Sequence, residues 1–188
     1  MGRDRKFSIT ELYEHTQALL LEVGYEGFTF SLLAERLHVA RGTIYKYFEN
    51  KDELITAFMI YEMNQFMKKL EQIEEKGDFE RQFTYLMEII FERTEIQELI
   101  NITKQVNTTN EKTVANQTYF KSMSINMYTC LQNFVQLGKQ EGKLNPSLPD
   151  TMILGFIFQS VAIPNHFQLP REQWVQSIIE MVSNGIRT

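Results

Sequence analysis

The stretch that decides the fold of this chain is Gly42-Thr43-Ile44-Tyr45-Lys46-Tyr47-Phe48-Glu49-Asn50-Lys51-Asp52-Glu53-Leu54. Its first half predicts a short helix over residues 41–48, in which Ile44 and Phe48 lie one turn apart and face the core. Asn50 is placed to cap the next helix, with Glu53 three residues on as its reciprocal partner. A glycine at the helix entrance and two tyrosines around a lysine indicate a helix that lies against a phosphate backbone.

Two further helices are expected upstream of this stretch. Residues 8–11 form a capping box, and apolar residues then recur at helical spacing up to Gly24, which is placed to end the first helix. Thr29 can cap a second, short helix. The inward-facing positions of that helix are expected to be Leu32, Leu33 and Leu37. Residues 38–40 leave room only for a tight turn, so the three helices predict a helix-turn-helix.

The region resembles the DNA-binding part of the tetracycline-repressor (TetR) family of transcription regulators. The usual sequence pattern of that family is glycine-threonine-leucine-tyrosine, an aromatic or basic pair, then asparagine or serine and lysine. The match runs over residues 8–54 and includes Phe28-Thr29-Phe30-Ser31-Leu32-Leu33-Ala34. Two positions depart from the pattern. His38 stands where glycine is common in the turn, and Ala40 replaces the serine or threonine that caps the reading helix.

Residue chemistry and the resemblance together give a set of DNA-contacting candidates. Arg41 is the best candidate base reader, because a guanidinium can bond guanine O6 and N7 together. Thr43 can contact a base, Gly42 lets the backbone approach closely, and Lys46 points toward the groove or its rim. The resemblance assigns the remaining tyrosines and lysine to phosphate contact or local packing. The full set is Thr29, Arg41, Gly42, Thr43, Tyr45, Lys46, Tyr47 and Lys51. For Tyr47, a partly buried ring that closes the small domain stays an alternative.

The rest of the chain predicts an all-α fold with about nine helices in total. Beyond the first three, helices are expected over residues 50–76, 79–93, 96–106, 114–142, 151–163 and 171–187. We expect residues 1–50 to form the helix-turn-helix DNA-binding domain. Residues 51–188 are expected to form a larger effector-binding and dimerisation domain.

The central helices are rich in methionine and aromatic side chains. Methionine is flexible and polarizable, and so suits a site that accepts varied apolar ligands. The candidates for such a site are Met63, Phe66, Phe83, Met87, Phe120, Met123 and Met127. The family resemblance implies a ligand cavity among these helices. Ordinary core packing is the alternative for each residue, and the choice stays open here.

The last two expected helices carry apolar stripes that a small monomer would struggle to cover, which indicates self-association. The family resemblance implies that they form a four-helix bundle between two subunits. The candidate interface residues are Ile153, Phe156, Ile157, Val175, Ile178, Ile179 and Val182.

Charge is permissive for DNA binding without indicating it. The net charge is −5, and residues 1–55 hold seven Lys and Arg against nine Asp and Glu. Locally the sign differs, because Arg36, Arg41, Lys46 and Lys51 fall within sixteen residues in which Glu49 is the only acid. Local charge sets the attraction for phosphate within a screening length of about 8–10 Å.

The sequence offers almost no chemistry for an enzyme. The histidines stand at no metal-ligand spacing, so we expect neither a metal nor another cofactor. There is no glycine-rich phosphate loop and no nucleophile elbow. The single cysteine, the absence of an apolar leader and a longest apolar stretch of only residues 152–158 lead us to expect a cytoplasmic protein without a membrane partner.

These features predict a homodimeric DNA-binding transcription regulator, a repressor released from a palindromic operator by an apolar or amphipathic effector. Its partners would be double-stranded operator DNA, a second copy of itself and that small molecule. The first alternative is a ligand-carrying or protein-interaction module without specific DNA binding, against which the motif of residues 42–54 argues. The second is a small enzyme on a helical scaffold, which no residue constellation supports.

Overall fold

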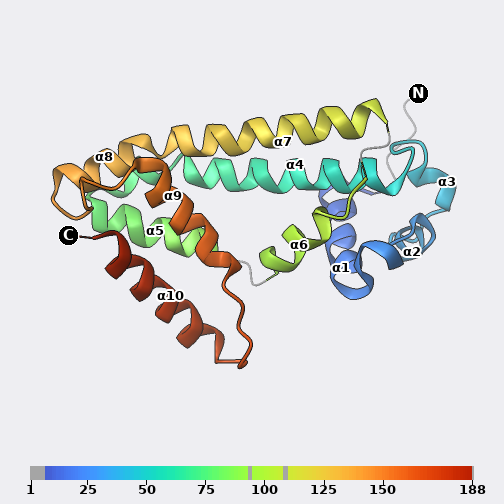
Figure 1. The fold of residues 1–188 in the computed structure, drawn as a ribbon. Coiled ribbons are helices and arrows are strands. Elements are labelled where there is room, and N and C mark those ends of the chain that lie inside the picture. The colour runs from blue at the N-terminus through green and yellow to red at the C-terminus, as the bar shows by residue number, and fades with distance from the viewer. Residues whose placement is uncertain (1–6, 93–94, 108–109, 188) are drawn as a thin grey trace. The chain divides into compact units, whose positions relative to one another are not determined.

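The all-α prediction is confirmed by a computed structural model, which describes residues 7–92, 95–107 and 110–187. Within these ranges the chain forms ten α-helices and two short 3-10 helices, and its only β-type pairing is an isolated bridge between Leu144 and Arg187. The elements, shown in Figure 1, are α1 (Ile9–Gly27), α2 (Phe30–Arg36), α3 (Arg41–Ile44), α4 (Lys51–Leu70), η1 (Ile73–Lys76), α5 (Phe79–Phe91), α6 (Ile96–Thr103), α7 (Glu111–Cys130), α8 (Gln132–Gln140), α9 (Asp150–Gln159), η2 (Ser160–Ala162) and α10 (Arg171–Ile186).

The chain packs as two compact units. The first contains Met1–Met63 and Glu95–Ser122, and the second contains Asn64–Thr94 and Met123–Thr188. The long helices α4 and α7 therefore each contribute residues to both units. The boundaries between these packing units do not coincide with the domain boundary expected after residue 50. That domain boundary concerns function and stays a prediction.

In the first unit, α1 supports the helix-turn-helix and α6 lies beside it (Figure 1). The predicted capping box is present, because Ser8 Oγ accepts the Glu11 amide at 3.0 Å and Glu11 Oε2 accepts the Ser8 amide at 3.3 Å. Gly24 interrupts α1 at φ 68° and ψ −178°, and a last turn follows it to Gly27. The core of this unit joins side chains from α1, α2, α3, α4 and α6, among them Leu12, Leu19, Leu33, Ile44, Leu54, Phe58 and Leu99.

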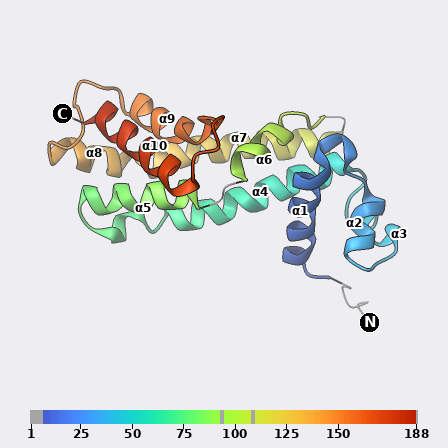
Figure 2. The ribbon, with the colours of Figure 1, turned by 90° about the horizontal axis from the view of Figure 1, so that it is seen from below.

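In the second unit, α8, α9 and α10 gather around α5 (Figure 2). Asp78 caps α5 by accepting the Arg81 amide at 3.0 Å. Phe79 then stacks on Phe134 of α8, with ring centroids 5.0 Å apart. Gly138 permits this approach, since a Cβ there would lie 2.6 Å from the Phe79 ring. At the end of α10, Arg187 makes a forked pair with Glu80 at 2.8 and 2.7 Å.

Several sequence-based expectations differ from the structure. The helices expected over 50–76 and 151–163 are α-helical only to Leu70 and Gln159, and each is followed by a short 3-10 helix. The helix expected over 114–142 is interrupted at Leu131, whose amide bonds the Tyr128 carbonyl three residues back and tightens the turn. The helix expected over 41–48 is α-helical only to Ile44 and continues as turns. Leu32 is 38% exposed, because the inward stripe of α2 begins at Phe30 and recurs at Leu33.

Candidate nucleic-acid interface

The connection between α2 and α3 is a tight turn built as the sequence predicts. Thr29 Oγ1 accepts the Leu32 amide at 3.3 Å and so caps α2. His38 adopts φ 53°, so the position where glycine is common keeps the left-handed conformation with a histidine. The Val39 amide then donates to the Ala34 carbonyl at 2.9 Å, which closes the turn back onto α2. The position of α3 relative to α2 is therefore fixed by backbone geometry.

Helix α3 is held by burial more than by its own helical structure. It spans only four residues, and its N-cap, Ala40, makes no side-chain hydrogen bond. An isolated helix of this length is not stable in water. Ile44 is fully buried and Phe48 is 9% exposed, as predicted, and both belong to the core of the first unit. Two buried side chains thus hold the segment in place while its other side chains stay at the surface.

The outer edge of α3 presents most of the predicted contact residues. Arg41, Gly42, Tyr45 and Lys46 are exposed and Thr43 is half-buried. A Cβ added at Gly42 would meet no atom within 4 Å, so packing inside this chain does not require a glycine there. What the missing side chain provides is an unobstructed backbone at the helix entrance.

Arg41 and Tyr45 contact each other on this edge. Arg41 Nη2 donates to the Tyr45 hydroxyl at 2.7 Å, and Arg41 Cζ lies 5.2 Å from the Tyr45 ring centroid. The Tyr45 ring in turn meets Phe30 of α2 edge-on, with centroids 4.9 Å apart. The guanidinium of Arg41 is therefore connected to the core through two aromatic rings.

Tyr47 packs against the segment that precedes α1. Its ring meets Phe7 at a centroid distance of 5.7 Å and an interplanar angle of 64°. The side chain is nevertheless 38% exposed. Tyr47 can therefore pack against the small domain and still offer part of its ring to a partner. Its phosphate contact stays a prediction.

Lys51 is engaged within the chain. Its Nζ donates to the Tyr25 carbonyl at 2.8 Å and lies 4.0 Å from the Tyr25 ring centroid. Of the two roles that the resemblance gives this residue, local packing is the one seen here. Lys51 fastens the first residue of α4 to the last turn of α1.

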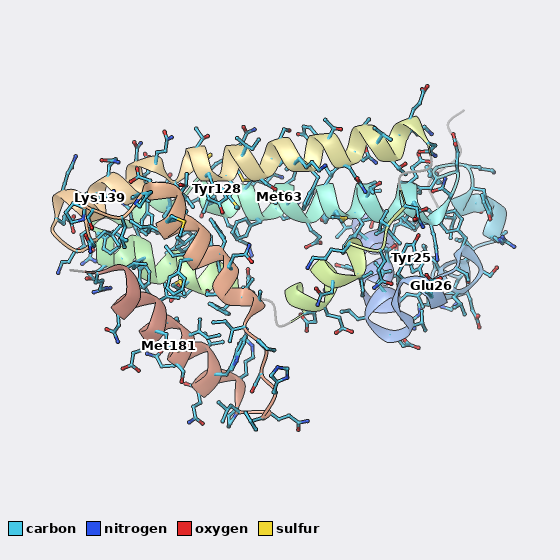
Figure 3. All side chains as sticks on the ribbon, viewed as in Figure 1. Tyr25, Glu26, Met63, Tyr128, Lys139 and Met181 are labelled. Atoms are coloured by element: carbon cyan, nitrogen blue, oxygen red, sulfur yellow. The ribbon has the colours of Figure 1, made fainter. Side chains whose placement is uncertain are left out.

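Tyr25 is the center of a buried polar joint that the sequence did not reveal. Its hydroxyl donates to Asp52 Oδ1 at 2.6 Å and accepts from Asn107 Nδ2 at 3.1 Å. Burial raises the pKa of Tyr25, and the hydrogen bond to Asp52 adds to this effect. Gly24, with its positive φ, places Tyr25 at the C-terminal end of α1 (Figure 3). A tyrosine directly after a helix-breaking glycine was visible in the sequence, whereas its partner 82 residues away was not.

The start of α4 is held by a second group of polar contacts. Asn50 Oδ1 accepts the Glu53 amide at 2.9 Å, which confirms the predicted cap. Glu53 Oε2 accepts the amide of Glu49, one residue before the position expected for a reciprocal box. Lys112 of α7 bonds Glu49 at 3.1 Å and Glu53 at 3.0 Å, and these two hydrogen bonds raise the pKa of Lys112. The beginning of α7 thus braces the beginning of α4.

Residues 12–58, which contain α2, α3 and the start of α4, match the family described as bacterial regulatory proteins, tetR family. An uncharacterized HTH-type transcriptional regulator of Haemophilus influenzae is 33% identical over 91 residues, which cover 47% of this chain and 49% of that protein. Residues 12–58 thus carry the sequence pattern of the TetR family. The fatty acid metabolism regulator protein of Bacillus subtilis is 37% identical over 60 residues, 31% of each chain. The matches thus span about half, or less, of the length of these curated relatives.

Solved structures extend the likeness of fold along the chain. The ketosteroid transcriptional regulator KstR2 of Mycobacterium tuberculosis superposes with a TM-score of 0.71 at 18% identity, covering 100% of this chain and 97% of that one. FadR of Bacillus subtilis in complex with stearoyl-CoA gives 0.69 at 22% identity, with 96% and 100% covered. AibR in complex with isovaleryl coenzyme A and operator DNA gives 0.64 at 17% identity, with 90% and 95% covered. At these identities the likeness shows the fold.

The predicted ligand-binding set is divided between the two compact units. Met63, which lies on α4 (Figure 3), and Phe120 belong to the first unit. In the second unit, Phe83, Met87 and Met127 are buried in the core cluster and Phe66 packs against it. Met123 of that unit is also buried. Burial of these residues agrees with the alternative of ordinary core packing. A ligand cavity stays a prediction.

A shallow surface depression in the second unit lies elsewhere, over η1 and the outer face of α5. It is lined by Lys76, Glu80, Arg81, Thr84, Tyr85 and Glu88. None of the seven predicted ligand-binding residues is among them. The lining carries three basic or aromatic side chains beside two acids, which does not match an apolar site.

The predicted dimer residues divide into a buried and an accessible group. Four of them, Ile153, Ile157, Ile178 and Val182, are core residues of the second unit itself. Val175 and Ile179 are half-buried, and Phe156 is 48% exposed. Two exposed methionines extend this apolar surface, Met152 at 66% and Met181 at 53%, the latter on α10 (Figure 3). The inner residues of each stripe therefore pack within the unit, and the outer residues stay accessible, so the dimer interface remains a prediction.

Other classes of site find no support in the described part of the chain. No group of three or more His, Cys, Asp or Glu there is arranged to hold a metal ion. None of the described helices combines the length and apolar character needed to cross a membrane.

Proposed function

We propose that this TetR-family regulator is a homodimeric transcription repressor that acts in the cytoplasm and binds a palindromic operator through α3. The observation that carries the proposal is the outer edge of α3. Arg41 and Lys46 project from a segment whose inner residues are buried, and Gly42 leaves the backbone unobstructed without serving packing inside the chain. A recognition helix that enters the major groove needs this combination of a base-reading arginine, a cationic side chain near the phosphates and close backbone approach.

Local charge supports phosphate attraction although the domain is acidic overall. Glu22 pairs with Arg36, and Lys112 bonds both Glu49 and Glu53. The acids nearest the reading edge are thus largely compensated within the chain. In the residues that the structure describes, Arg41 and Lys46 make no ion pair with an acid. Their charges remain available to DNA within a screening length of about 8–10 Å.

The homodimer is proposed from the accessible apolar surface of α9 and α10. Met152, Phe156 and Met181 are large apolar side chains of one unit that remain well exposed. A patch of this kind marks an association surface. A twofold dimer would present two copies of α3 to half-sites about 34–36 Å apart, which matches a palindromic operator.

The proposed effector is an acyl-coenzyme A or a similar amphipathic thioester. Support comes from two proteins of the same fold, FadR with stearoyl-CoA and AibR with isovaleryl coenzyme A and operator DNA. The cluster of soft side chains Phe66, Met87 and Met127 suits an acyl chain if the core opens around it. For release, the effector must bind the DNA-free conformer more tightly than the DNA-bound one.

The test is selection of bound DNA from a random library with the full-length protein. We expect enrichment of a twofold-symmetric consensus and loss of binding to it when acyl-CoA of increasing chain length is added. A consensus that survives every acyl-CoA would remove the effector class and keep the regulator. Enrichment of no sequence at low and high salt would instead favour a carrier or interaction module.

A further inference from the structure

We propose that Tyr45 is a positioning residue for base recognition, holding the Arg41 guanidinium in its reading orientation instead of serving as a phosphate contact. The inference rests on the proposed function, because it assigns a specific role within the α3 reading edge. The resemblance leaves Tyr45 between phosphate contact and local packing, whereas this inference gives it a defined part in base recognition.

The contact between the two side chains is made in two ways at once. Arg41 Nη2 donates to the Tyr45 hydroxyl at 2.7 Å, and Arg41 Cζ lies 5.2 Å from the ring centroid. The second distance is within the range of about 6 Å in which a cation is attracted to an aromatic face. Both side chains are exposed, so neighbouring atoms do not force the pair together. The hydrogen bond and the ring contact are what define the guanidinium position.

Tyr45 itself is anchored to the domain core. Its ring meets Phe30 edge-on at 4.9 Å, and Phe30 is buried as the first residue of α2. Thr29, directly before Phe30, caps the same helix. The contacts from Phe30 to Tyr45 and from Tyr45 to Arg41 therefore fix the Arg41 guanidinium relative to α2.

This arrangement has a direct consequence for recognition. A free arginine side chain loses much rotamer freedom when it binds, and a side chain already held in place loses less. A guanidinium has more N–H groups than the one given to Tyr45, so a parallel pair remains for guanine O6 and N7. A misaligned arginine would still attract phosphate but would lose the paired geometry. Tyr45 should therefore affect discrimination between bases more than overall attraction to DNA.

The alternative role has a different signature. A phosphate contact contributes to every DNA sequence alike, because the backbone carries no sequence information. A positioning contact contributes only where the base that Arg41 reads is present. It also disappears when Arg41 is absent, since a residue that acts through another has no separate effect.

The experiment is a double-mutant cycle on the full chain with two duplexes. One duplex carries the selected consensus, and the other has the base pair read by Arg41 exchanged in both half-sites. We expect Tyr45→Phe to weaken binding to the consensus by about two- to tenfold, the range for one hydrogen bond, and to leave the exchanged duplex unaffected. In the Arg41→Ala background, Tyr45→Phe should have no further effect. Tyr119→Phe, which removes an exposed hydroxyl from α7, is the matched control.

The outcomes separate the two roles. Equal weakening on both duplexes, or the same weakening in the Arg41→Ala background, would assign Tyr45 to the phosphate backbone and overturn the inference. No change on either duplex would also overturn it. Tyr45→Phe keeps the ring against Phe30, and an unchanged melting temperature confirms that the variant is folded. If the wild-type chain enriches no sequence at all, the proposed function fails and this inference fails with it.

Discussion

Removing the Tyr25 hydroxyl tests whether the buried joint at the end of α1 stabilises the first unit. Tyr25→Phe keeps the ring beneath Lys51 Nζ and the backbone carbonyl that this lysine bonds. It removes only the hydrogen bonds to Asp52 and Asn107. The substitution therefore isolates the hydroxyl from the aromatic packing.

The size of the effect follows from the burial of Tyr25 and Asp52. A hydrogen bond to a charged group contributes about 1.5–3 kcal/mol and a neutral one about 0.5–1.5 kcal/mol. Asp52 is only 8% exposed, so water compensates little for the lost donor. We expect Tyr25→Phe to lower the free energy of unfolding by about 2–4 kcal/mol.

The pH dependence of the same variant has a defined sign. Because the pKa of Tyr25 is raised in the folded chain, the unfolded chain loses this proton first as pH rises. The contribution of the hydroxyl is therefore complete below the ordinary tyrosine pKa of about 10 and is lost above it. The stability difference between wild type and Tyr25→Phe should shrink as pH rises beyond about 10.

Urea unfolding followed by circular dichroism at fixed protein concentration measures both effects. Tyr119→Phe, an exposed tyrosine on α7, is the control and should change stability by less than about 0.5 kcal/mol. A similarly small loss in the free energy of unfolding for Tyr25→Phe would refute the inference that this hydroxyl stabilises the first unit. A difference that stays constant through pH 10 would refute the assignment of the raised pKa.

Four further predictions concern DNA and assembly. Arg41→Ala should weaken consensus binding by about 1–3 kcal/mol and relax one base position per half-site, and an unchanged consensus on repeated selection would remove Arg41 as a reader. Lys46→Ala should weaken all sequences alike and reduce the slope of log affinity against log salt by about one; a sequence-dependent loss would contradict a backbone role. Lys51→Ala should reduce that slope only if the lysine leaves Tyr25 for DNA, and a loss of stability at constant slope would restrict it to the joint. Phe156→Glu should convert dimers to monomers or aggregates in sedimentation, and a wild-type monomer at micromolar concentration would contradict the proposed interface.

Local rules were sufficient for most of the helix-turn-helix. The cap at Thr29, the left-handed turn at His38 and the burial of Ile44 each depend on residues within a few positions of one another. Such signals are readable because capping, turn geometry and apolar spacing act over one or two helical turns. The stripe of α2 was misjudged at Leu32 because its first member, Phe30, stands directly after the cap and looks like part of the connection.

Long-range contacts were not readable in the same way. The Tyr25–Asn107 bond and the Lys112 bonds join segments tens of residues apart, and polar side chains carry no periodic signature of their partner. For the apolar stripes of α9 and α10 the sequence identified the residues but not the direction in which each one faces. Periodicity identified Ile153 and Phe156 together, but which of them faces its own unit depends on helix packing in three dimensions.

The residues of the segment 41–48 are under two different constraints. Ile44 and Phe48 are constrained by the interior, whereas Arg41, Thr43 and Lys46 alternate with them and face outward. Substitutions at the outward positions leave the interior intact, so operator preference can diverge between descendants of one ancestral gene at little cost in foldability. A duplicated copy could thus acquire a new regulatory target through a few codon changes while inheriting its scaffold unaltered.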